Sequence, residues 1–247
     1  MTYHFLATFA TTKRIIEQLL HDKRTIALMF LAPTLLMTLL WWVFSNNSKL
    51  FDAIAPALLG VFPFVIMFLI TRITTLRERT GGTLERLMAT RISKADIVFG
   101  YALAFSIFGI VQSLITTFVS VYVLGMSATG PLWFVVVVAI ADTLLGVVLG
   151  LLASAFARTE FQAVQFMPAF IFPQLIVCGL FVPLAQLPDA LNAVAYWLPL
   201  TYAVDALNGV VAHTDVTADM WRDVWAVVAF IAGALCLASL TLRRQSK

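Results

Sequence analysis

Residues 25–44 read TIALMFLAPTLLMTLLWWVF, twenty consecutive residues without a charged side chain. A helix needs about 20 apolar residues to cross the hydrocarbon core of a bilayer. A helix also satisfies its own backbone hydrogen bonds, which water cannot do inside lipid. This stretch therefore predicts a transmembrane helix.

Five further apolar runs of similar length follow, at residues 53–74, 97–124, 131–156, 163–182 and 221–242. Across the 247 residues, 61% are hydrophobic and only 12% are charged, and the mean hydropathy is +0.95. A soluble domain has about 45–50% apolar and about 25% charged residues. The sequence therefore predicts an all-α integral membrane protein with six transmembrane helices, forming a single domain over residues 1–247.

The basic residues are distributed unevenly between the two sides of this predicted bundle. Of the 16 Lys and Arg residues, only Lys49 and Arg222 fall on the side opposite the two termini. Six others flank or lie in the connection after the second run: Arg72, Arg77, Arg79, Arg86, Arg91 and Lys94. Connections rich in Lys and Arg stay in the cytoplasm. We therefore expect a multi-pass plasma-membrane protein with both termini cytoplasmic, surrounded by lipid, and we expect no nucleic-acid partner from its net charge of +3.

The segment before the first run, residues 1–24, has apolar side chains on one helical stripe. The stripe consists of Phe5, Phe9, Ile16, Leu19 and Leu20. Polar side chains that fall away from it are Lys13, Arg14, Glu17, Gln18 and Asp22. This pattern favours an amphipathic helix lying in the membrane interface, the alternative being a solvated tail.

The cytoplasmic connection at residues 75–96 contains the stretch RERTGGTLERLMATRIS at 77–93. The Gly81–Gly82 pair is expected to end the preceding helix, and Thr83 to cap a short new one. On that helix Leu84, Leu87 and Met88 would share one face. Ser93 is expected to cap the next helix together with an acidic residue three positions later, Asp96. An exposed apolar face on so short a helix needs either a partner protein or the inner membrane surface, and the pattern alone favours neither.

Residues 183–212 contain two apolar segments, each too short to span a bilayer. Proline precedes or begins each of them, which fits the first turn of a short helix. Aromatic residues there suit the outer membrane interface. The sequence therefore predicts a re-entrant extracellular helical hairpin before the last span, closing the outer mouth of the bundle as a gate formed by Pro183, Pro188, Tyr196, Trp197, Pro199 and Tyr202.

Three stretches of the chain resemble the ABC-2 type permease family, of the kind that includes drug-resistance and Nod-factor exporters. The first is RERTGGTLERLMAT at 77–90, and the second is GLLASAFART at 150–159. The third combines CGLFVP at 178–183 with LP at 187–188 and LPLTYAVDAL at 198–207. They occur in the family's order, and the similarity extends over roughly the whole chain.

This resemblance implies a role for each part of the chain. The short helix would be a coupling helix that docks on an ABC ATPase subunit through Thr83, Leu84, Glu85, Arg86, Leu87 and Met88. Two permeases, either two copies or two homologous chains, would assemble with two ATPases in a bacterial inner membrane. The sequence has no G-x-x-x-x-G-K-[ST] phosphate loop. We therefore expect this chain to be no enzyme by itself and to bind no cofactor, with ATP and Mg on the partner ATPase.

Asp142 is the acid that falls plainly inside a predicted span. An ionisable group there marks a functional site by default. With Gly146, Gly150 and Ser154 it forms a ridge spaced by four, so it should face protein and not lipid. Candidate residues of a translocation path are Asp142, Gln162, Gln165 and Gln174. The alternative is that Asp142 is a buried, hydrogen-bonded carboxyl group and that the glutamines only bond between helices.

The leading functional hypothesis is a membrane permease subunit of an ATP-driven exporter. The alternative is a proton-coupled secondary transporter that uses Asp142. An embedded enzyme would need clustered His, Ser or acidic residues on facing helices, and the sequence offers neither these nor a metal-binding spacing. The cargo stays open among drug-like, lipid-like, peptide and glycan molecules.

Overall fold

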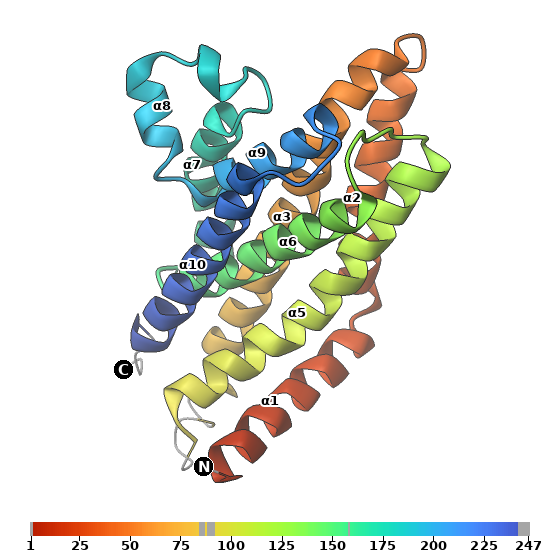
Figure 1. Ribbon diagram of the computed structural model, residues 1–247. Helices are drawn as coiled ribbons and strands as arrows, with labels where there is room; N and C mark the ends of the chain where they lie inside the picture. Colours follow the sequence, from red (N-terminus) through yellow and green to blue (C-terminus); the bar gives the residue numbers. More distant parts are fainter. Residues whose placement is uncertain (1, 84–86, 88–91, 158, 242–247) are drawn as a thin grey trace.

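The computed structural model describes residues 2–83, 87, 92–157 and 159–241. These residues form helices joined by short connections, and they contain no β-strand (Figure 1). The helices are α1 (Thr2–His21), α2 (Lys23–Val43), α3 (Ser48–Thr80), α5 (Lys94–Phe118), α6 (Leu132–Ser154), α7 (Glu160–Val177), α8 (Asp189–Ala195), α9 (Pro199–Ala212) and α10 (Ala218–Thr241). A π-helical turn, Val119–Val123, extends α5, and a 3-10 turn, Leu184–Gln186, precedes α8.

The all-α membrane fold expected from the sequence is confirmed. Among the described residues, five helices are long and apolar enough to cross a bilayer, namely α2, α3, α5 with its π-helical turn, α6 and α10. The sixth expected span corresponds to α7, in which the apolar part found is shorter, Pro168–Val177. The apolar run predicted a helix that reaches residue 182, but α7 ends at Val177. It ends there because Gly179 adopts a positive φ of 91°, which breaks the helix.

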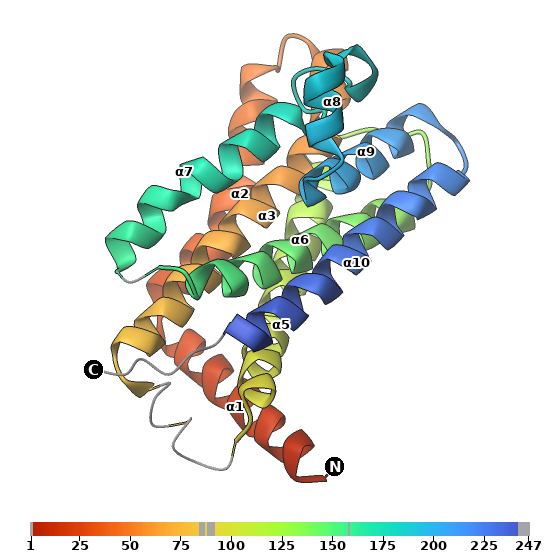
Figure 2. The same ribbon diagram turned by 90° about the vertical axis from the view of Figure 1, so that its left-hand side faces the viewer.

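The bundle has two distinct ends (Figure 1). Helix α1 begins, α3 ends, α5 begins and α10 ends at the same one, which we call the basic end because Arg77, Arg79 and Lys94 lie there. The opposite end carries α8 and the start of α10, and we call it the hairpin end. Figure 2 shows α7 and α10 on either side of α6.

Helices α3 and α6 make the most extensive helix–helix contact in the described chain. A Cβ atom added at Gly146 would lie 2.5 Å from the carbonyl oxygen of Phe64, and one added at Gly150 would lie 2.5 Å from that of Phe68. The two backbones therefore touch directly, as small residues spaced by four allow in membranes. The prediction that this ridge of α6 faces protein is confirmed, and Asp142 at its head is fully buried.

Two boundaries predicted around the 75–96 connection are confirmed, whereas Thr83, expected as a helix cap, is itself helical. Helix α3 is capped by Gly81, and Gly82 follows with a positive φ of 74°. Ser93 and Asp96 form a capping box at the start of α5. Helix α3 is longer than the apolar run suggested, because the Arg77–Arg79 segment continues the helix to Thr80.

Helix α1 presents two different faces. Ile15 and Leu19 are buried against the bundle, with exposed fractions of 1% and 2%, and α1 packs mainly on α5. Phe5, Phe9 and Leu20 from the predicted stripe stay exposed. The face of α1 that packs on protein is therefore rotated from the predicted apolar stripe, although Leu19 belongs to both. The location of the exposed face in the membrane interface stays a prediction.

A polar network fastens α1 to the end of α3. The Arg14 guanidinium donates two hydrogen bonds to the Glu78 carboxylate, at 3.0 and 2.8 Å. The Gln18 side-chain amide donates to the same carboxylate at 2.6 Å, and the Tyr101 hydroxyl of α5 also donates to it. Glu78 is only 8% exposed. Arg14 and Gln18, expected on the solvated face of α1, thus hold three helices together at the basic end.

The close contact predicts that Gly146→Ala destabilises the protein. Its methyl group would overlap the Phe64 carbonyl, and backbone cannot move aside as a side chain can. Overpacking costs about 1–3 kcal/mol, so the midpoint of thermal unfolding in detergent should fall by several degrees.

The matched control is Gly233→Ala in α10, where an added Cβ meets no atom within 4 Å. That change should leave the midpoint unchanged or raise it slightly, because Ala favours a helix over Gly by about 1 kcal/mol. Equal effects of the two substitutions would contradict the direct backbone contact.

The network predicts that Glu78→Gln loosens α1. Removing one partner of a largely buried ion pair costs about 2–4 kcal/mol, less than for a fully buried pair because Arg14 is 28% exposed. Hydrogen exchange of the α1 amides should accelerate by at least about tenfold, since each ~1.4 kcal/mol gives a factor of ten. Glu17→Gln is the control, because its pair with Lys13 is exposed and long at 3.9 Å and contributes about 0–1 kcal/mol.

Candidate functional site

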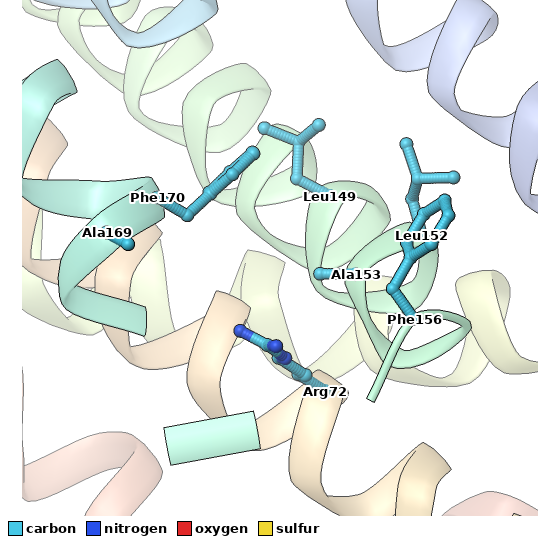
Figure 3. Close-up of a pocket in the computed structure, with 7 residues that line it drawn as sticks. All are labelled: Arg72, Leu149, Leu152, Ala153, Phe156, Ala169 and Phe170. Carbon is cyan, nitrogen blue, oxygen red and sulfur yellow. The ribbon is translucent and has the colours of Figure 1, made fainter. Parts of the chain in front are cut away.

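A groove crosses the face of the bundle between α7 and α10, and α6 forms its floor. Near the basic end it holds a cavity of about 340 Å³ (Figure 3). Toward the hairpin end it holds a second cavity of about 700 Å³. Both are lined by Leu149, Leu152, Ala169 and Phe170, so the two cavities adjoin each other. Volumes of about 300–1,000 Å³ are typical of small-molecule pockets.

The hairpin end of the groove includes residues predicted for the path and for the gate. Gln174 of α7 lines the larger cavity, as do Trp197 and Pro199 at the junction of α8 and α9. The Gln174 amide donates to the Phe170 carbonyl at 3.2 Å, and its buried side-chain oxygen has no partner among the described residues. The structure therefore brings one predicted path residue and two predicted gate residues to a single groove.

Arg72 of α3 lines the end of the groove nearer the basic end. Figure 3 shows its side chain rising from α3 toward the space between α6 and α7, near Ala153 and Phe170. Arg72 is 3% exposed, and its guanidinium lies 5.8 Å from the centre of the Phe68 ring. Arg72 was expected to flank or lie in the connection after the second apolar run, but it is a buried residue of the bundle. Its position inside the apolar run 53–74 was the signal that could have identified it.

Asp142 lies elsewhere, at the junction of α3, α6 and α9. A Cβ added at Gly60 would lie 3.1 Å from an oxygen of the Asp142 carboxyl group and 2.9 Å from Leu207. Both carboxyl oxygens are buried and have no hydrogen-bond partner among the described residues. Asp142 does not line either cavity of the groove.

Two further predicted path residues also lie outside the groove lining. Gln162 is in the first turn of α7, where its backbone N–H donates to the Thr159 hydroxyl at 3.1 Å. Gln165 is exposed. The predicted set of four path residues is therefore divided among three places, and only Gln174 contacts the groove.

The remaining predicted gate residues lie around α8. Pro183 precedes the 3-10 turn, and Pro188 is the N-cap residue of α8. The Tyr202 hydroxyl of α9 donates to the Tyr196 carbonyl at 2.8 Å, and the two rings lie 6.2 Å apart. This contact ties the end of α8 to the first turn of α9. Whether these residues open and close a path stays a prediction.

Of the predicted coupling residues, the structure describes Thr83 and Leu87. Both are helical, and Leu87 is partly buried against the cluster that includes Ile15 and Leu19 of α1. Leu84, Glu85, Arg86 and Met88 lie outside the described residues. Part of the expected docking face at Leu87 is therefore covered by this chain itself.

A cleft of about 250 Å³ lies beside Thr83, between α1 and the end of α3. Its lining combines apolar residues of α1 with the charged groups Asp22, Arg77 and Glu78. Hydrogen bonds from the Thr25 side chain and backbone hold the pKa of Asp22 below its usual value, so the cleft presents a carboxylate at neutral pH. Among the described residues, no group of three His, Cys, Asp or Glu could hold a metal ion.

Comparison with known proteins gives a family match over most of this structure. The family model described as ABC-2 type transporter matches residues 7–211, from α1 to α9. ABC transporter G family member 20 of Dictyostelium discoideum is 29% identical over 211 residues, covering 83% of this chain and 28% of that protein. The probable multidrug ABC transporter permease YbhS of Escherichia coli is 26% identical over 189 residues, covering 76% of this chain and 49% of that protein.

A third relative is the linearmycin resistance permease protein LnrN of Bacillus subtilis. It is 28% identical over 160 residues, which cover 64% of this chain and 41% of that protein. The chain thus spans less than half the length of these relatives. The family model, in contrast, matches well over half of the chain, and the protein therefore belongs to the ABC-2 type transporter family.

Proposed function

We propose that this chain is the membrane-spanning permease subunit of an ATP-driven exporter whose energy comes from a separate ABC ATPase subunit. The observation that carries the proposal is the family match from α1 to α9. Two relatives are named as a multidrug permease and a resistance permease, which supports export as the direction.

In this proposal the basic end is the cytoplasmic end, as its arginines favour. The coupling segment follows α3 directly, and Gly81–Gly82 separates it from that helix. Glu78, three residues before the glycines, is bonded to Arg14 of α1 and Tyr101 of α5. An ATPase that moves the coupling segment would therefore act on three helices together. ATP and Mg would be held by that partner.

The groove is the part of the permease best suited to contact cargo. It extends from Arg72 near the basic end to Trp197 and Pro199 near the hairpin end. Its largely apolar lining suits a drug-like or lipid-like molecule better than a glycan or a polar peptide. A second permease, either another copy or a homologous chain, would complete the path across the membrane.

Charging the predicted coupling face should prevent ATPase binding. We predict that Leu84→Asp and Met88→Asp each reduce the amount of ATPase that co-purifies in mild detergent by at least about tenfold, because a buried unpaired charge costs several kcal/mol. The partner is recognised by its G-x-x-x-x-G-K-[ST] sequence. These positions are preferred to Leu87, which also packs on this chain's own core.

The control is Lys13→Gln, which also makes the basic end one unit less positive at an exposed side chain of α1. It should retain the ATPase. Purification of the wild-type chain without any ATPase, together with substrate movement in vesicles lacking ATP, would overturn the proposal.

The alternative of a proton-coupled transporter depends on Asp142. Its enclosed position away from the groove lining favours a structural role. We predict that Asp142→Asn leaves ATP-dependent efflux within about threefold of wild type, less than the tenfold that ~1.4 kcal/mol of barrier would produce. Efflux measured in vesicles with and without a pH gradient checks this. Loss of efflux with normal ATPase binding would favour the proton-coupled mechanism.

A further inference from the structure

We propose that the groove binds an acidic lipid, with its anionic head group on Arg72 and its hydrocarbon chain along Leu149, Leu152 and Phe170. The inference concerns binding and is independent of ATP-driven transport. Arg72 is buried without a counter-ion among the described residues, the groove beside it is apolar, and Arg72 lies near the depth of the lipid head groups.

Arg72 is a buried cation without a counter-ion in the described part of the chain. Its side chain is 97% enclosed, given an exposed fraction of 3%. Among the described residues, its Nε atom has no hydrogen-bond partner and its guanidinium forms no ion pair. Its guanidinium makes a cation–π contact with the Phe68 ring, whose centre lies 5.8 Å away. Because a guanidinium cannot neutralise itself by losing a proton in proteins, burial of its charge calls for an anion.

The neighbouring arginines do not share this condition. Arg79, two turns further along α3, donates to the carbonyls of Ser154 and Ala155 at 2.8 and 3.0 Å. Arg14 is paired with Glu78. Neither cavity of the groove is lined by an acidic residue. The missing anion is therefore expected to come from a ligand that enters the groove.

The rest of the groove favours a ligand with a long apolar part. Six of the seven residues around the 340 Å³ cavity are apolar, and Arg72 is the exception. The adjoining 700 Å³ cavity adds Phe230, Leu237 and Trp197. A free inorganic anion would leave this apolar surface unused, whereas an acyl chain would cover it.

The depth of Arg72 fits a lipid head group. The 33 residues of α3 extend about 50 Å, roughly 20 Å more than the hydrocarbon core of a bilayer. Arg72 lies eight residues before Thr80, or about 12 Å from the end of the helix. It is therefore near the boundary between hydrocarbon and head groups at the basic end, where lipid phosphates lie. Arginine binds phosphate through two parallel hydrogen bonds, which gives both affinity and orientation.

Lipid retention in nanodiscs tests this inference. The full chain is reconstituted with equal amounts of phosphatidylglycerol and phosphatidylcholine, without an ATPase, and the lipids that stay bound are identified by native mass spectrometry. Wild-type protein should retain phosphatidylglycerol preferentially. In Arg72→Gln this preference should fall by at least about tenfold, the factor that ~1.4 kcal/mol of lost interaction produces. Arg72→Lys should lose less, because it keeps the charge but not the paired hydrogen bonds.

Two further variants separate the groove from general charge effects. Arg24→Gln removes one positive charge from an exposed side chain at the same end and should keep the preference. Ala153→Leu keeps Arg72 but narrows the groove beside it, and it should reduce phosphatidylglycerol retention even if Arg72→Gln fails to fold.

Four outcomes would overturn the inference. The first is no lipid preference in the wild-type protein, and the second is an unchanged preference in both Arg72→Gln and Ala153→Leu. The third is displacement of the lipid by millimolar inorganic phosphate, with the same phosphate affinity in Ala153→Leu as in wild type. The fourth is that Arg72→Gln and Ala153→Leu change the oligomeric state of the protein without changing its lipid retention. The last result would identify the groove as a contact between copies of the chain. Because no ATPase is present, each outcome is independent of the proposed transport cycle.

Discussion

The direct backbone contact between α3 and α6 is the constraint on which the rest of the bundle depends. Lipid surrounds helices as favourably as apolar side chains do, so helices in a membrane associate through close packing and interhelical hydrogen bonds. Gly146 and Gly150 supply that closeness against Phe64 and Phe68. The spacing by four continues in both directions along the same faces. It places Asp142 beside Gly60 toward the hairpin end and Ser154 at the end of α6, where Arg79 donates to the Ser154 and Ala155 carbonyls.

The groove is a consequence of this arrangement. One side of α6 is committed to α3, while α10 packs on α6 and α9, and α7 packs on α3. Leu149 and Leu152 on the remaining side of α6 are therefore left as a floor between two walls (Figure 2). Arg72 follows Phe68 by one turn on α3, just beyond the point where Gly150 holds the helices together. Its side chain consequently reaches past α6 into the groove (Figure 3) and is not directed to water.

The helices were predictable from sequence because their signals are local. Apolar length identified five of the six expected spans in the described chain, Gly81–Gly82 ended α3, and Ser93 with Asp96 began α5. The groove was not predictable, since it depends on which helices lie next to one another. Arg72 resembles any basic residue near a cytoplasmic connection until α6 and α7 are placed around it. The Arg14–Glu78 pair joins residues 64 apart in sequence, and neither residue carries a local sign of the other. Asp142 was correctly expected to face protein because the glycine ridge is a local pattern, yet its separation from Gln174 required the fold.

The position of the Glu78 network has a mechanical consequence for a permease driven from outside the membrane. A coupling segment joined to α3 through two glycines alone would bend at those glycines and transmit little force. Leu87 instead packs on the hydrophobic cluster to which α1, α3 and α5 all contribute. On the α3 side of the glycines, Glu78 is paired with Arg14 of α1. The chain is therefore attached to the packed bundle on both sides of the glycines, and Tyr101 extends the Glu78 network to α5. In the proposed complex, a displacement of the segment would be passed to α1, α3 and α5 as one unit. Because α3 packs directly on α6, Arg72 and the floor of the groove would move together with α3. The proposed ATPase contact would thus be linked to the proposed ligand site through packed helices and not through a flexible loop.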